Sequence, residues 1–265
     1  MTAVSPEMHR RIDAELTRIE TEEDVRILFA IESGSRAWGF HSPDSDYDVR
    51  FVYVRPLAWH LRLEPGRDVI ERPLDDELDI SGWDLRKALN LMLSGNAVLG
   101  EWIRSPIRYR RAEAMDGLET LAASTLRRRP ATWHYVNLLQ RQMDRVRMAD
   151  GSVRLKSLLY SVRPALCLRW IARHDRAFPP MDMARLMAEA APDAATAAAI
   201  DDLIALKLTQ PEGGRVESFD PLLCQFIDTE RTAARAWLAR QDEPPSEADD
   251  HAACEAFHIA QVTAI

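Results

Sequence analysis

The sequence predicts an α+β fold in which a small mixed β-sheet is followed by an α-helical part. Residues 25–33 and 47–54 are short apolar runs rich in β-branched and aromatic residues, and residues 77–83 form a third short run. From residue 112 onward, apolar residues instead recur at helical spacing. We therefore expect a mixed-sheet domain over residues 1–110, a helical domain over 111–240, and an acidic, Pro-containing C-terminal tail over 241–265.

The N-terminal part is expected to alternate helices and strands. A helix is predicted over 5–21, because Ser5 is a suitable N-cap and Pro6 suits the first helical position. The strand at 25–33 ends at Gly34, and turn residues lead to the strand at 47–54. A Pro-containing loop then precedes the strand at 77–83 and an amphipathic helix over 84–96.

The later part of the chain is expected to be mainly helical and contains no internal repeat. The apolar spacing predicts helices over 112–127, 131–149, 153–174, 181–190, 193–208 and 219–240.

Composition narrows the class of protein. The chain has 265 residues, 46% of them hydrophobic, and a net charge of -8, so a general nucleic-acid binder is disfavoured. Residues 120–180 nevertheless hold 12 basic and 3 acidic residues, and such a segment suits phosphate-rich partners. Three scattered cysteines and the lack of a long apolar run predict a cytoplasmic protein with no membrane partner.

The stretch Gly34–Val54 carries the clearest chemical signal. Gly34 and Ser35 end one predicted strand, and Asp46 and Asp48 accompany the next, where residues two apart share a face. Glycine permits close backbone approach to a bound group, and a Ser hydroxyl can hold phosphate oxygens. Paired carboxylates repel unless a cation lies between them, and their hard oxygens suit Mg²⁺ or Mn²⁺. The combination predicts a metal–nucleotide site, whereas either half alone would be ordinary surface-turn chemistry.

A third carboxylate is expected on a later strand. Asp79 is the first choice, because apolar residues flank it and an adjacent strand would let it face the acid pair. Glu77, on the same strand face, and Asp84, at the start of the helix, remain alternatives.

These residues resemble the DNA polymerase β-type nucleotidyltransferase superfamily, whose hallmark is an apolar strand, Gly-Ser, and an Asp-x-Asp pair on the next strand. The resemblance extends to the RNA repair pathway DNA polymerase beta family through "ESGSRAWGF", "SPDSDYDVRFVY", "GWDLRKAL", "EWIRSPI" and "KSLLYSVRPALCLRWI". These blocks span about residues 27–175.

The resemblance implies a two-metal enzyme that transfers a nucleoside monophosphate from a nucleoside triphosphate, such as ATP, to an acceptor hydroxyl. It implies that Gly34 and Ser35 hold the triphosphate, and that Asp46, Asp48 and Asp79 bind Mg²⁺ or Mn²⁺. Asp79 would also receive the acceptor's proton. The family name implies that the acceptor hydroxyl belongs to an RNA end, for example that of a tRNA-like molecule. An acceptor hydroxyl on a protein or small molecule remains an alternative. A protein that binds nucleotides as a sensor without catalysis is a further alternative.

Further residues are candidates for contacts with the nucleotide. One predicted helical face carries Lys156, Tyr160 and Arg163, and it would close over the triphosphate and base. A solvent-exposed polar face without a binding role would have the same sequence pattern. Arg36 follows Ser35, and Arg50 shares a strand face with Asp48, so each is expected near the phosphates or the acids.

Two residue groups have competing interpretations. Glu32 precedes the turn and is interpreted as an orienting partner or a strand-end residue. The run Arg127–Arg129 is interpreted as ending a helix, where it would complement the helix dipole, with RNA backbone contact as the alternative.

Overall fold

The computed structural model describes residues 4–64, 66–73, 77–146, 152–210, 214–216, 218–240 and 248–264. The chain forms two compact units. Unit 1 comprises Met1–Ala37, Asp46–Leu126 and Pro245–Ile265, and unit 2 comprises Trp38–Ser45 and Arg127–Pro244. Each unit is described separately below.

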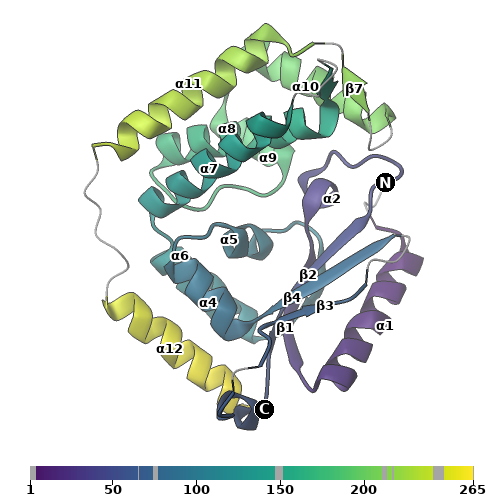
Figure 1. Ribbon diagram of the computed structural model, residues 1–265, viewed down its shortest axis with the longest axis vertical. Helices are drawn as coiled ribbons and strands as arrows, with labels where there is room; N and C mark the ends of the chain where they lie inside the picture. The colour runs from purple at the N-terminus through teal and green to yellow at the C-terminus, as the bar shows by residue number, and fades with distance from the viewer. Residues whose placement is uncertain are drawn as a thin grey trace. The chain divides into compact units, whose positions relative to one another are not determined.

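Unit 1 is built on a mixed sheet of the predicted kind (Figure 1). Its strand order is β3-β4-β2-β1-β5, in which β2 and β4 are parallel and the other neighbouring pairs are antiparallel. The strands are β1 (Arg26–Glu32), β2 (Tyr47–Val54), β3 (Val69–Glu71), β4 (Leu78–Asp84) and β5 (Arg108–Arg111). The sequence analysis located β1, β2 and β4 but missed the three-residue β3 and the Arg-rich β5, whose side chains show little apolar alternation.

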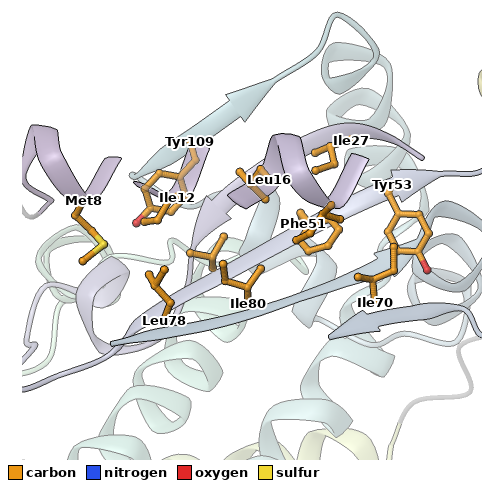
Figure 2. Packing of buried hydrophobic residues seen from close by; sticks show 13 residues of the cluster. Met8, Ile12, Leu16, Ile27, Phe51, Tyr53, Ile70, Leu78, Ile80 and Tyr109 are labelled. Carbon is orange, nitrogen blue, oxygen red and sulfur yellow. The ribbon is translucent and has the colours of Figure 1, made fainter. Parts of the chain in front are cut away.

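One face of this sheet packs against helix α1 (Pro6–Glu23), which has the predicted Ser5 cap: the Ser5 Oγ accepts from the Met8 amide at 3.1 Å. Figure 2 shows side chains of α1 lying over side chains of β2 and β4. Alternation places Val49, Phe51 and Tyr53 of β2 in this buried cluster. The neighbouring Asp48 and Arg50 therefore project from the opposite face.

The face of the sheet opposite α1 packs against helices. The helices of this part of unit 1 are α4 (Leu85–Leu93), α5 (Val98–Ile103) and α6 (Ala114–Thr125), with α4 against β2 and β4 and α6 against β1 (Figure 1). The short α2 (Gly34–Trp38) follows β1, and the unpredicted α3 (Leu57–His60) follows β2. The deep burial of β2 on both faces explains its nearly continuous apolar sequence.

The expected C-terminal tail contains a helix. Residues 241–247 lie outside the described residues, but α12 (Ala248–Thr263) packs against α4 and α6 of unit 1. Its Cys254 and Val262 are buried. The acidic, Pro-containing start of the segment concealed the helix-favouring residues after it.

Unit 2 is helical, as predicted. Its elements are α7 (Arg128–Val146), β6 (Val153–Arg154), α8 (Leu155–His174), α9 (Met183–Ala190), α10 (Ala194–Thr209), β7 (Arg215–Val216) and α11 (Pro221–Leu238). The buried face of α8 contacts α7, α9, α10 and α11. None of the described helices in either unit has the length and apolarity needed to cross a membrane.

The position of the arginine run differs from the prediction. Helix α6 ends at Thr125, and Arg128 begins α7 with Pro130 in its first turn, where proline is tolerated. Arg128 and Arg129 therefore lie at the N-terminal end of a helix, and the interpretation based on a favourable helix dipole is wrong.

Candidate active site

The Gly-Ser turn and the aspartate strand meet in unit 1. Gly34 begins α2 with a φ of +58°, a conformation that glycine adopts readily. A Cβ atom built on Gly34 would lie 1.9 Å from Asp48 Oδ2, so the Gly34 backbone contacts that carboxylate directly. The backbone amide of Ser33 also donates to the Asp48 carbonyl at 2.8 Å. The residues between the two halves of the motif therefore let the chain reverse direction, so that β2 lies beside the turn.

Asp79, the third predicted acid, lies beside Asp48. Because β2 and β4 are parallel and in register, Asp79 lies directly opposite Asp48. The two alternatives lie elsewhere. Glu77 precedes β4 and pairs with Arg11 of α1 at 3.2 Å, whereas Asp84 caps α4 at the far end of β4 by accepting from the Arg86 amide at 2.9 Å.

Arg50 connects the two opposed carboxylates. Its Nη2 lies 3.0 Å from Asp48 Oδ1 and 2.7 Å from Asp79 Oδ2, while its Nη1 donates to the Asp79 carbonyl at 2.8 Å. One guanidinium thus balances two carboxylates that would otherwise repel. Arg50 was expected near the acids or the phosphates; the structure shows its pairing with the acids, and its contact with a nucleotide stays a prediction.

Asp46 lies immediately before β2, which starts at Tyr47, and its side chain is exposed. The expectation that both motif aspartates lie on the strand therefore holds only for Asp48. Among the described residues, no group of three or more His, Cys, Asp or Glu side chains is arranged to hold a metal ion. In this arrangement the Asp48 and Asp79 carboxylates are instead bridged by Arg50.

A buried carboxylate fixes the turn to the strand. Glu32, at the end of β1, has no exposed surface, and its Oε1 accepts from the Asp48 amide at 3.0 Å. Tyr109 of β5 donates its hydroxyl to Glu32 Oε2 at 2.5 Å, and Arg36 Nε lies 3.8 Å from Oε1. This geometry agrees with the interpretation of Glu32 as an orienting partner. Sequence reasoning missed Tyr109, because only the pairing of β5 with β1 brings it there.

Burial makes Glu32 easier to protonate. Loss of hydration raises its pKa to about 7, an effect that the hydrogen bonds from Tyr109 and from the Asp48 amide reduce but do not cancel. The ionised form is therefore less favourable in the folded chain than in the unfolded chain. Stability contributed by Glu32 is present below the ordinary carboxyl pKa and declines as pH rises to about 7.

We expect Glu32→Gln to remove this pH dependence. The free energy of unfolding of the wild type relative to the variant should fall by about 3 kcal/mol between pH 4.5 and pH 8. Urea titrations at several pH values in EDTA measure this difference, in which the contributions of groups that do not interact with Glu32 cancel. A difference that stays constant with pH would show that Glu32 does not titrate in the folded state.

Ser35 and Arg36 are held inside unit 1. Both side chains are buried, and the Arg36 guanidinium lies 3.9 Å from the centre of the Tyr47 ring. This stacking and the nearby Glu32 carboxylate fix the direction of Arg36 beside the turn. Their expected contacts with a triphosphate stay predictions.

The three residues expected on α8 belong to unit 2. Lys156 Nζ lies 5.6 Å from the Tyr160 ring centre, and the Tyr160 ring contacts that of Trp38 at 4.7 Å. Arg163 is only 1% exposed; it donates to the Met181 carbonyl and lies over the Trp38 ring at 4.5 Å. Arg163 is therefore part of the interior of unit 2, and nucleotide binding by these three residues stays a prediction.

Two known proteins are similar to this chain. The chain is 41% identical over 224 residues to the uncharacterized protein YcgL of Bacillus subtilis (strain 168), covering 84% of this chain and 85% of that protein. A crystal structure of a nucleotidyltransferase-like protein from Exiguobacterium sibiricum 255-15 is similar over 88% of this chain and 81% of that one, with a TM-score of 0.32 and 12% identity.

The decisive match covers nearly the whole chain, across both units. Residues 8–255 match the RNA repair pathway DNA polymerase beta family, and the matched range contains Gly34, Asp48 and Asp79. Such membership indicates a nucleotidyltransferase. This chain belongs to the RNA repair pathway DNA polymerase beta family.

Proposed function

We propose that this protein transfers a nucleoside monophosphate from a nucleoside triphosphate to a hydroxyl at an RNA end, in a reaction that uses Mg²⁺ or Mn²⁺. The observation that carries the proposal is the meeting of Gly34 with Asp48, opposite Asp79, in unit 1. A phosphate-binding turn beside opposed carboxylates is the arrangement that nucleotidyl transfer requires.

The donor set fits a hard divalent cation. Asp48 and Asp79 offer carboxylate oxygens from adjacent strands, and Asp46 lies two residues before Asp48. The pairing of both carboxylates with the Arg50 guanidinium supports this fit, because it places positive charge between them. When bound, the cation would neutralise phosphate charge and align the reacting phosphoryl group.

The side chains have separate roles in the proposed reaction. The Gly34 backbone and the Ser35 hydroxyl would hold the triphosphate, while Asp46, Asp48 and Asp79 would hold the cation. The Asp79 carboxylate also accepts the proton of the attacking hydroxyl. The new bond joins that hydroxyl oxygen to the α-phosphorus, and pyrophosphate leaves. Glu32 acts indirectly, because its contact with the Asp48 amide sets the position of the strand.

A transfer assay tests this function. The protein is incubated with Mg²⁺ or Mn²⁺, each α-labelled nucleoside triphosphate in turn, and total cellular RNA, beside an Asp46→Asn/Asp48→Asn double variant. Label on RNA that is absent with the variant is expected. Label on a protein or small molecule would retain the chemistry and replace the acceptor, whereas nucleotide binding without any transfer would favour a sensor.

We expect Arg50→Gln to strengthen cation binding. The substitution removes a positive charge that contacts both carboxylates, so Mn²⁺ should bind about tenfold more tightly in calorimetry without nucleotide. Arg55→Gln is the matched control, because Arg55 follows β2 but pairs with Glu23. Equal or weaker Mn²⁺ binding by a folded Arg50→Gln protein would contradict a cation site at Asp48 and Asp79.

A further inference from the structure

Helix α7 of unit 2 exposes an aromatic side chain among arginines. We define the α7 surface as Arg129, Trp133, Asn137, Arg141 and Arg145, successive positions four residues apart. Ala131, Thr132, Tyr135, Val136 and Leu139 form the buried side of the helix. Asn137, Arg141 and Arg145 are exposed, whereas Arg129 is half-buried at the edge.

Trp133 is an unusual residue for such a position. Its side chain is 44% exposed, and it is the only aromatic residue among the exposed large hydrophobic residues in the described part of the chain. Trp is enriched at interfaces because its ring offers a large contact area, so an exposed indole among arginines is a candidate for stacking against a ligand.

Arg141 and Arg145 of this surface differ from three other arginines of the basic segment. Arg128 pairs with Asp175, Arg169 pairs with Glu230 at 2.9 Å, and Arg163 is buried. By contrast, Arg141 and Arg145 have no carboxylate partner among the residues that the structure describes. Asp144 lies on the same side of α7 and accepts from Gln140 Nε2 at 2.9 Å.

We propose that the α7 surface binds single-stranded RNA, with a base stacked on Trp133 and phosphates at Arg141 and Arg145. Stacking on an exposed indole does not depend on base identity, and a guanidinium matches a phosphate in shape and charge. The two arginines are about 6 Å apart along the helix axis, a scale that suits neighbouring phosphates. A single-stranded RNA uses both features of the surface, because its bases stack on the indole while its phosphates pair with the arginines.

The choice of RNA rests on the proposed function, in which RNA is the acceptor, but the binding itself requires neither nucleotide nor cation. It can therefore be measured on the full chain in EDTA. A fluorescently labelled, unstructured 12-nucleotide RNA is titrated with wild-type protein, Trp133→Ala, and the Arg141→Gln/Arg145→Gln double variant, and anisotropy reports the affinity at several salt concentrations.

A charge-matched control is available in the same unit. Arg173 and Arg176 near the C-terminal end of α8 are exposed, so Arg173→Gln/Arg176→Gln removes the same charge from a different surface. We expect the α7 double variant to bind RNA at least tenfold more weakly, with a salt slope smaller by about 1.4. Trp133→Ala should weaken binding about tenfold with an unchanged slope, and the control should bind like the wild type.

Several outcomes would overturn the inference. One is an unchanged RNA affinity in both α7 variants. Another is an equal loss of affinity in the Arg173→Gln/Arg176→Gln control. A third is displacement of RNA by polyglutamate at equal charge concentration, which would indicate an acidic protein partner. Failure of the proposed function has a different signature. Labelling of a non-RNA acceptor, or no transfer at all, by a protein that binds RNA through α7 would refute the reaction while preserving the surface.

Discussion

Replacing Asp48 with Asn should abolish nucleotidyl transfer while preserving the fold. The variant keeps the shape of the side chain but removes a negative charge that faces Asp79 and contacts Arg50. Loss of the proposed cation from this place should lower kcat/KM by roughly a thousand-fold, because metal stabilisation of the reacting phosphate is worth several kcal/mol. Quantification of label transferred from the α-phosphate measures this loss.

The Asp48→Asn experiment needs a control in the same stretch of chain. Asp44→Asn alters an exposed aspartate in the preceding turn, outside the proposed site, and should retain activity close to that of the wild type. Thermal unfolding in EDTA should show Asp48→Asn within about 1 kcal/mol of the wild type. Full activity of a folded Asp48→Asn protein would refute the assignment of this residue to catalysis.

Replacing Gly34 with Ala should damage both stability and activity. A positive φ destabilises the folded chain when the residue carries a Cβ atom. The added methyl would also overlap Asp48 Oδ2, which lies 1.9 Å from the Cβ position. The Asp48 carboxylate must then leave its present position, in which it contacts Arg50. We expect a loss of about 3 kcal/mol in unfolding free energy and a fall in transfer comparable to that of Asp48→Asn.

Gly39→Ala separates the two causes. Gly39 also has a positive φ, of +89°, but no atom lies within 4 Å of its Cβ position. This variant should lose only the backbone contribution, about 1 kcal/mol, and keep its activity. If Gly34→Ala and Gly39→Ala have equal effects on stability and transfer, the close approach of Gly34 to Asp48 has no functional weight.

The sequence predicted the elements whose pattern is set locally. The bounds of β2 agree with the predicted strand at 47–54, because its apolar residues must be buried in any sheet. The Ser5 cap and Pro6 likewise fixed the start of α1. Short elements such as β3 and β5 were missed, because they are strands only where neighbouring strands supply hydrogen bonds.

The candidate site was predictable to a similar extent. Gly34, Asp48 and Asp79 could be selected because turn chemistry, strand alternation and an apolar flank are properties of neighbouring residues. The alternatives Glu77 and Asp84 could not be separated from Asp79 without the strand register. Tyr109 had no sequence signal, since its partner Glu32 lies 77 residues earlier in the chain.

The sequence by itself determined the mixed-sheet and helical parts, the turn, and the candidate acids. Only the tertiary structure decided that Arg50 bridges Asp48 and Asp79, that Arg163 is buried, and that Arg128 begins a helix. The physical reason is that propensity and periodicity act between residues close in the chain. Ion pairing and burial depend instead on strand register and helix packing, which join residues distant in sequence.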